Sequence, residues 1–407
     1  MFSFRTTPFF QQPDLVLKGG KLGVLCNQTA WHPETGEYLF ESLARKGNLK
    51  RIFTPEHGLF SELQDQVKLD TANCYADISR EVEFVSLYGD SEESLTASVD
   101  KLSDIDALII ELQDVGCRYY TYISTIHNLF KALKENNINL SIYIIDRANP
   151  AGRQVEGTML RAGYRSFIGV DGIPHRHGLT IGELSYFLYN EIGAKFPLHI
   201  ISYKAQTNKD LLPWSIPPSP NFPGLFTAHF YSGQCLWEGT NLSEGRGTTR
   251  PFELFGAPYL EEIADYNQKH GLKNWNDENG PLYDPGVYIR WMKFIPTFHK
   301  YANECCMGFQ LLMNPNMQYH ALSHALRIMR FLHDNCRGFA FREGKYEAGN
   351  DRNAIELLLG DKELIDFVSG EGEWSGIKEH IKVEEQKWIK KCKKILLYED
   401  EQLYRIK

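Results

Sequence analysis

The sequence predicts an α/β protein built on a parallel β-sheet, followed by a second, smaller α/β domain. Three observations lead to this prediction. The first half of the 407-residue chain alternates short β-rich runs with helical patterns, which is typical of strand–helix–strand units. Several of these runs are apolar almost throughout, as expected for strands covered on both faces. The chain is also longer than a single hydrophobic core usually allows, so we expect two domains.

Six strands and four helices are expected in the first half of the chain. The strands are 22–26, 50–54, 83–88, 106–112, 141–145 and 198–202. The helices lie between them at 37–46, 93–101, 122–136 and 180–192. Because strands and helices alternate, the pattern predicts a Rossmann-like sheet domain over residues 1–230.

A proline-rich segment, 213–223 (PWSIPPSPNFP), then interrupts the alternation. Proline cannot continue a helix or a central strand, so this segment is a domain boundary or an ordered active-site loop. Residues 231–407 are expected to form the smaller α/β domain that completes a cleft. Its helices are expected near 259–270, 318–334, 351–359, 362–369 and 383–396.

Composition and charge argue against several classes of protein. A net charge of −8 without a sustained Lys/Arg cluster excludes nucleic acid as a partner. No apolar run is long enough to cross a bilayer, so we expect no membrane span. The start, MFSFRTTPFFQQPD, lacks the pattern of a signal peptide, and none of the eight cysteines forms a Cys-x-x-Cys pair. We therefore expect a cytoplasmic protein, with a periplasmic or secreted location as the alternative if a signal peptide was removed.

Compact polar motifs follow five of the expected strands. They are Asn27-Gln28-Thr29, Pro55-Glu56-His57-Gly58, Tyr88-Gly89-Asp90, Gln113-Asp114-Val115-Gly116 and Asp146-Arg147-Ala148-Asn149-Pro150. Ligands of open parallel sheets bind beyond the carboxyl ends of the strands, so five such motifs predict a polar ligand site. For each motif alone, a turn or a helix cap is the competing explanation.

A cofactor or a metal is not expected. A dinucleotide site needs glycines directly after the first strand, and here that turn reads NQTAWHPETG. The phosphate-binding loop that ends in Gly-Lys-Ser/Thr is also absent from the sequence. His175 and His177 make only half a metal site, because no carboxylate or cysteine stands at a recognisable spacing.

Three further segments combine glycine or proline with polar residues, namely 174–183 (PHRHGLTIGE), 217–221 (PPSPN) and 238–248 (EGTNLSEGRGT). They follow, in order, NQT, PEHG, LYG, QDVGCRYYTYIST, DRANPAG and VEG. This ordered series, from Gly23 to about Gly308, resembles the exo-β-N-acetylmuramidase family of the NamZ type. Ala148 is a departure, since relatives often carry proline there, and the last hundred residues resemble the family less closely.

The resemblance implies a glycoside hydrolase that releases terminal N-acetylmuramic acid from the non-reducing end of peptidoglycan fragments. It implies peptidoglycan-derived saccharides as partners, no cofactor, and an active cleft between the two domains. The alternative is a protein that binds muropeptides or other sugars without cleaving them.

Glycoside hydrolysis requires a proton donor and charge stabilisation at the anomeric carbon. Glu56 is the leading candidate for the general acid, and His57 either orients it or replaces it as acid/base. Asp114, Glu238 and Glu244 are the contenders for the second carboxylate. In some enzymes acting on 2-acetamido sugars, the acetamido oxygen of the substrate is the nucleophile, and the sequence leaves both routes open.

Muramic acid carries a lactyl carboxylate, which the planar guanidinium of arginine binds better than lysine does. Arg246 is favoured for this role over Arg118, Arg147 and Arg176. The residues expected to bind hydroxyl groups and the acetamido group are Asn27, Gln28, Tyr122, Asn149, His177, Asn221 and Asn241.

Overall fold

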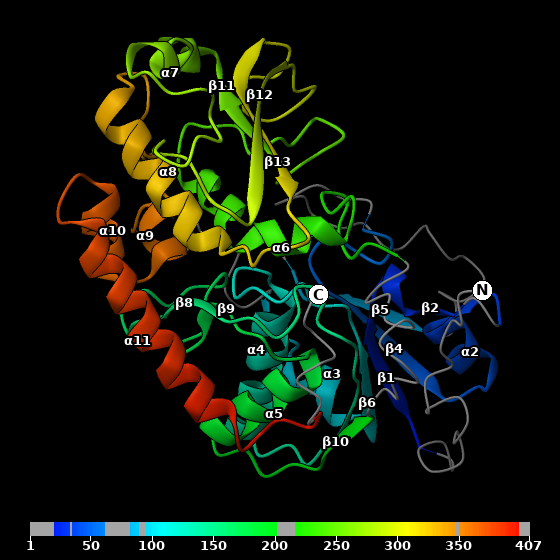
Figure 1. Cartoon of the computed structure of the whole chain (residues 1–407). Helices are drawn as coiled ribbons and strands as arrows, with labels where there is room; N and C mark the ends of the chain where they lie inside the picture. Colours follow the sequence, from blue (N-terminus) through cyan, green and yellow to red (C-terminus); the bar gives the residue numbers. More distant parts are fainter. Residues whose placement is uncertain are drawn as a thin grey trace.

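The computed structural model describes residues 20–32, 35–61, 82–88, 95–201, 216–346 and 350–398. Several expected features lie outside these ranges, namely Gly89 and Asp90, the start of the helix expected at 93–101, residue 202, residues 213–215 and both ends of the chain. In the described residues, the N-terminal half contains a six-stranded sheet and the C-terminal half a three-stranded sheet (Figure 1).

The six-stranded sheet is parallel throughout. Its strands are β1 (Leu22–Cys26), β4 (Leu49–Thr54), β5 (Glu83–Ser86), β6 (Ala107–Glu111), β7 (Ser141–Ile145) and β10 (Leu198–Ile201). They lie in the order β10-β7-β6-β1-β4-β5, which is the 3-2-1-4-5-6 arrangement of a Rossmann sheet. The predicted fold class is therefore confirmed, and each expected strand lies within two residues of its observed bounds.

Helices cover this sheet because each presents one apolar face to it. They are α2 (Leu39–Arg45), α3 (Val99–Ser103), α4 (Tyr122–Glu135) and α5 (Ile181–Glu191). In α4 the side chains of Ile126, Leu129 and Leu133 recur at helical spacing and are buried. At the start of α5, Thr180 and Glu183 cap each other's backbone N–H groups, which explains part of the motif RHGLTIGE.

The C-terminal half contains an antiparallel sheet in the order β11-β13-β12, covered by helices. The strands are β11 (Leu254–Ala257), β12 (Val287–Phe294) and β13 (Cys306–Met313). The helices are α6 (Leu225–Gln234), α8 (Ala321–Asn335), α9 (Ala354–Leu359), α10 (Lys362–Val368) and α11 (Trp374–Cys392). A second, smaller α/β unit thus follows the parallel sheet, as the sequence predicts.

The prediction of one continuous helix near 259–270 was wrong. The chain forms a 3₁₀-helix, Pro258–Ile263, and then a short helix, α7 (Tyr266–Lys269). Only Leu260 and Ile263 are buried in the first of these. Their spacing of three residues matches the 3₁₀ repeat, which brings such pairs onto one side.

The long helix α11 joins the two halves of the molecule. It runs along one side of the protein, from α10 of the C-terminal half to α5 beside the parallel sheet (Figure 1). Near its end, Trp388 donates its indole N–H to the carbonyl oxygen of His177 at 2.8 Å and packs edge-on against Phe187 of α5. One hydrophobic cluster also includes core residues of both halves, such as Phe130 and Trp237. Among the described residues, no helix combines the length and the apolar character that crossing a membrane requires.

Candidate active site

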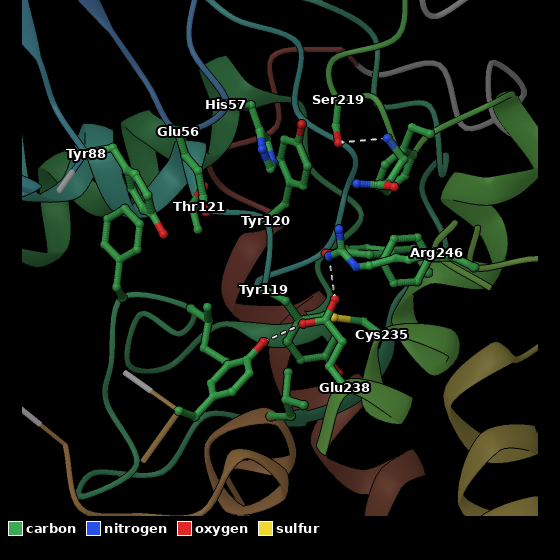
Figure 2. Close-up of a pocket in the computed structure, with 18 residues that line it drawn as sticks. Glu56, His57, Tyr88, Tyr119, Tyr120, Thr121, Ser219, Cys235, Glu238 and Arg246 are labelled. Atoms are coloured by element: carbon green, nitrogen blue, oxygen red, sulfur yellow. Dashed lines mark hydrogen bonds and ion pairs between the residues drawn. The ribbon is translucent and has the colours of Figure 1, made fainter. Parts of the chain in front are cut away.

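A pocket opens where the carboxyl ends of β4 and β5 face the C-terminal half (Figure 2). About 660 Å³ of space lies between its walls, part of it open solvent. The lining residues are Glu56, His57, Tyr88, Tyr119, Tyr120, Thr121, Phe167, Ile168, Ser219, Asn221, Phe222, Tyr231, Cys235, Glu238, Arg246, Phe252, Tyr346 and Leu358. Both halves of the chain therefore build this site.

Glu56 and His57 reach the pocket because β4 ends at Thr54 and the chain turns sharply there. The N–H of Gly58 donates to the carbonyl oxygen of Pro55 at 3.2 Å and closes the turn. His57 has a φ of +71°, a left-handed conformation that costs a non-glycine residue about 1 to 3 kcal/mol. Such strain is retained where the surrounding structure fixes a side chain in place, and here it fixes two titratable side chains at the pocket wall.

Thr121 holds the carboxylate of Glu56. The Thr121 hydroxyl donates to Oε2 of Glu56 at 2.6 Å, and both side chains are buried, with exposures of 7% and 5%. Thr121 is the N-cap residue of α4, yet its hydroxyl makes no capping bond to that helix. The hydroxyl thus binds Glu56 and does not cap the helix. The Glu56 carboxylate also lies near the N-terminus of α4, where negative charge is favoured.

Arg246 and Glu238 form an ion pair on the opposite side of the pocket (Figure 2). Nη2 of Arg246 lies 2.8 Å from Oε1 of Glu238, and the hydroxyl of Tyr346 donates to Oε2. The guanidinium of Arg246 also lies over the ring of Phe252, with 5.1 Å from its central carbon to the ring centroid. The positions of both charged groups are therefore fixed without a ligand.

Glu244 lies behind this pair, outside the pocket lining. Its carboxylate is fully buried and contacts Arg246 at 3.3 Å, His299 at 3.0 Å and Lys300 at 3.0 Å. Burial by itself would raise the pKa of Glu244, but Lys300, His299 and Arg246 outweigh burial and hold that pKa well below its ordinary value. A carboxylate held ionised in this way orients Arg246 rather than donating a proton.

Aromatic rings form one wall of the pocket. Tyr231 packs edge-on against Phe222 and Phe252, with ring centroids 4.8 and 4.9 Å apart, and Tyr120 packs edge-on against Phe222 at 5.7 Å. Edge-on packing holds such rings rigidly. The wall therefore has a defined shape.

Asp114 and His177 lie outside the lining and bind each other. The N–H of Leu179 donates to Nδ1 of His177, so Nε2 carries the proton and donates to Oδ2 of Asp114 at 3.2 Å. The same carboxylate oxygen accepts the N–H of Gly116 at 2.8 Å. The pair thus fixes the turn after β6.

The other arginines proposed for the lactyl carboxylate bind buried groups of the protein itself. Arg118 is completely buried and donates to the carbonyl oxygens of Thr158, Ile173, Leu358 and Leu359; burial lowers its pKa to about 10. Arg147 pairs with the buried Glu111 at 2.6 Å. Arg176 pairs with Glu156 at 2.7 Å. None of these three arginines lines the pocket.

Of the three asparagines predicted at 149, 221 and 241, one lines the pocket and two bind backbone groups elsewhere. Asn221 lines the pocket, on the proline-rich loop, where its N–H donates to Oγ of Ser219 at 3.2 Å. Asn149 and Asn241 lie elsewhere, because their amides bind backbone groups of Ala151 and Leu179 and of Gly338 and Ala340, respectively.

Gln28, beyond β1, and Tyr122, at the start of α4, bind the proline-rich loop, and Asn27 supports Tyr122. The amide of Gln28 donates to the carbonyl oxygen of Pro217 at 2.8 Å, and the hydroxyl of Tyr122 donates to that of Pro218 at 2.9 Å. Asn27 in turn donates to the Tyr122 hydroxyl at 2.6 Å. These three residues therefore position the loop that carries Ser219 and Asn221.

Comparison with known proteins agrees with this architecture. The model described as the N-terminal part of the exo-β-N-acetylmuramidase NamZ matches residues 22–225, and the model of its C-terminal part matches residues 229–398. The chain belongs to the NamZ family. A relative named peptidoglycan β-N-acetylmuramidase NamZ, from Bacillus subtilis (strain 168), is 34% identical over 78% of this chain and 74% of its own length.

Two solved structures share the fold of this NamZ family member. Both are crystal structures of DUF1343 family proteins from Bacteroides fragilis NCTC 9343. The first has a TM-score of 0.75 at 26% identity and the second a TM-score of 0.69 at 25% identity. Each comparison covers 96% of this chain and 97% of the other, so the likeness includes both halves of the pocket.

Several lining residues were not among the predicted site residues. Thr121 lies within the motif QDVGCRYYTYIST, which gave a signal for this segment but not for that side chain. Phe167 and Ile168 lie in an ordinary connecting loop, and Tyr346 is 108 residues from its partner Glu238. No local pattern marks these three residues as part of a site.

No metal site is evident in the part of the chain that the structure describes, where no group of three or more His, Cys, Asp or Glu side chains is placed to hold an ion. His175, half of the His-x-His pair, is fully buried, and its Nδ1 lies 2.5 Å from the hydroxyl of Tyr119. Burial, together with the nearby charge of Arg118, lowers the pKa of His175 well below its ordinary value.

Proposed function

We propose that this chain is an exo-β-N-acetylmuramidase, a glycosidase that releases N-acetylmuramic acid from the non-reducing ends of peptidoglycan fragments. Membership of the NamZ family and the activity in the name of the Bacillus subtilis relative support this function. The observation that carries the proposal is one pocket with a held carboxylate, Glu56, on one side and an arginine, Arg246, on the other. Binding without cleavage, the alternative, is disfavoured because the relative is named for a hydrolytic activity.

Glu56 is the proposed general acid, which protonates the glycosidic oxygen as the bond to the leaving sugar breaks. The hydrogen bond from Thr121 to Oε2 fixes the orientation of the Glu56 carboxyl group at the pocket wall. His57 follows Glu56 on the strained turn and also lines the pocket, a position that suits either of its two candidate roles, orienting Glu56 or replacing it as acid/base.

Glu238 is the proposed second carboxylate. Of the three contenders, it lines the pocket, whereas Asp114 and Glu244 do not. Arg246 and Tyr346 hold its two oxygens, which fixes the orientation of the Glu238 carboxylate in the pocket. An ionised carboxylate in this position stabilises positive charge at the anomeric carbon or polarises the acetamido group of the substrate.

Arg246 is the proposed recognition group for the lactyl carboxylate. Of the four candidate arginines, it lines the pocket, and its side chain is only 7% exposed. A guanidinium that is already held in place loses little side-chain entropy when a carboxylate binds it. This preference would separate muramic acid from sugars without the lactyl group.

The test is hydrolysis of the disaccharide N-acetylmuramyl-β-1,4-N-acetylglucosamine, whose leaving sugar requires a proton, by the wild type, by Glu56→Gln and by Glu261→Gln, a control at an exposed glutamate outside the pocket lining. The expected loss of kcat in Glu56→Gln is roughly 100-fold or more, with ligand binding retained. No hydrolysis by a correctly folded wild type would refute the proposed function. Equal rates in Glu56→Gln and the wild type would refute the role of Glu56.

A further inference from the structure

The two sides of the pocket differ in chemistry and in exposure. Arg246 and Glu238 are buried on one side, and both are charged. On the other side, Tyr88, Phe167 and Ile168 form a mainly apolar surface and are each half-buried. Figure 2 shows Tyr88 beside Glu56, on the side away from Arg246. The charged side is therefore the closed end of the pocket, and the apolar surface lies towards solvent.

Tyr88 and Phe167 form this apolar surface together. Their ring centroids lie 6.0 Å apart and the ring planes are inclined by 42°, although the residues come from different segments. Tyr88 follows the carboxyl end of β5, and Phe167 lies in the connection between β8 (Glu156–Met159) and β9 (Pro174–Arg176). Two aromatic rings inclined in this way form a shallow, apolar concavity.

The backbone that carries Phe167 and Ile168 is fixed. The N–H of Ser166 donates to the carbonyl oxygen of Gly169 and the N–H of Gly169 to that of Ser166, both at 3.2 Å. This pair of bonds makes Phe167 and Ile168 the tip of a tight turn. Arg352 of the C-terminal half braces the same connection, because its guanidinium lies 4.2 Å from the ring centroid of Tyr164. The tip is thus positioned before any ligand binds.

We propose that Tyr88, Phe167 and Ile168 form the binding surface for the leaving sugar, the residue released when the muramyl bond is cut. This inference rests on the proposed function. A general acid must lie at the bond between the two sugars, so the muramyl unit and the leaving sugar extend from Glu56 in opposite directions. The anionic muramyl unit lies towards Arg246, which leaves the side of Tyr88 and Phe167 for the neutral sugar.

The chemistry of this surface suits N-acetylglucosamine. One face of a pyranose ring presents C–H groups, which pack against the electron-rich faces of aromatic rings. The three described residues that form this surface are uncharged, as suits a neutral sugar. Binding energy gained here acts on a part of the substrate that does not react, and an enzyme uses such energy to position the scissile bond.

The test compares the binding of a ligand that reaches only the Arg246 side of the pocket with the binding of one that also reaches Tyr88 and Phe167. In a Glu56→Gln background, which prevents turnover, calorimetry measures the affinity for N-acetylmuramic acid and for the disaccharide N-acetylmuramyl-β-1,4-N-acetylglucosamine. Phe167→Ala is expected to weaken disaccharide binding roughly 10-fold and to leave monosaccharide binding within about 2-fold. Phe226→Ala, at a phenylalanine that is 54% exposed and outside the pocket lining, is the matched control and should change neither affinity.

Phe167→Tyr keeps an aromatic ring at the tip and should retain disaccharide affinity, which also guards against a folding defect in Phe167→Ala. Equal weakening of both ligands by Phe167→Ala, or weakening of neither, overturns the proposal. These outcomes differ from failure of the proposed function, in which the enzyme with Glu56 intact would not cleave the disaccharide at all.

Discussion

Removing the hydroxyl of Thr121 should change the pH dependence of the enzyme without dismantling its site. Thr121→Val keeps the shape of the side chain and deletes the 2.6 Å hydrogen bond to Glu56. A hydrogen bond to a charged group contributes roughly 1.5 to 3 kcal/mol, and about 1.4 kcal/mol corresponds to one pKa unit. Because the lost bond favours the carboxylate, the pKa of Glu56 should rise by about 1 unit or more.

The direction of the shift follows from the role of the residue. A general acid is active while protonated, so a higher pKa of Glu56 keeps it active to higher pH. The alkaline limb of the kcat/KM profile should therefore move up by about 1 pH unit in Thr121→Val. If Glu56 acts ionised instead, the acidic limb will move up by the same amount.

Two controls make this experiment decisive. Thr121→Ser keeps the hydroxyl and should reproduce the wild-type profile. Thr125→Val removes a buried hydroxyl one turn further along α4, where the partner is the carbonyl oxygen of Thr121 at 3.2 Å, and should also leave the profile unchanged. A Thr121→Val enzyme with the wild-type melting temperature and an unmoved profile would show that Thr121 does not tune Glu56.

Three further predictions follow from contacts described above. Arg246→Lys keeps the charge but loses the planar guanidinium, so KM for a β-N-acetylmuramide should rise roughly 10-fold in steady-state assays. Arg118→Met leaves buried carbonyl groups without donors, so urea denaturation should show a free energy of unfolding lower by roughly 3 kcal/mol. Burial raises the pKa of Asp146 from 3.8 to about 6, so its contribution to stability is complete below pH 3.8 and is lost as the pH rises through 6. Asp146→Asn should remove that part of the pH dependence, roughly 3 kcal/mol, when unfolding is compared at low and neutral pH.

The sheet could be predicted from the sequence because each strand is a local apolar run. The strands at 22–26 and 141–145 match the prediction at both ends. Helix α11 begins at Trp374, well before the expected start at residue 383, although Ile377 and Ile381 continue its buried face. The early turns of α11 are rich in charged residues, so the apolar face was not recognised there from the sequence. The contacts of Arg118 could not be predicted, because two of its carbonyl partners lie 240 and 241 residues away in sequence.

The polar rim of the sheet was the basis of the site prediction, and the fold explains why only part of it reaches the pocket. The motifs after β4 and β5 contribute Glu56, His57 and Tyr88 to the lining, whereas the motifs after β1, β6 and β7 contribute no lining residue. β4 and β5 are neighbours at one edge of the sheet, so the site lies towards that edge.

In a Rossmann sheet the usual ligand position is the crevice between the first and fourth strands, which here are β1 and β6. The proline-rich loop fills that crevice, because the carbonyl oxygens of Pro217 and Pro218 bind Gln28, beyond β1, and Tyr122, the first residue of α4. Ser61, beyond β4, donates to Pro218 as well, at 2.9 Å. The residues that hold a dinucleotide in other proteins of this fold are thus replaced by residues that hold a loop, and that loop carries Asn221 to the pocket. The strand ends still bind polar groups, as in other sheets of this kind, but most of these groups belong to the chain itself. The ligand pocket therefore lies at the ends of β4 and β5, towards the edge of the sheet.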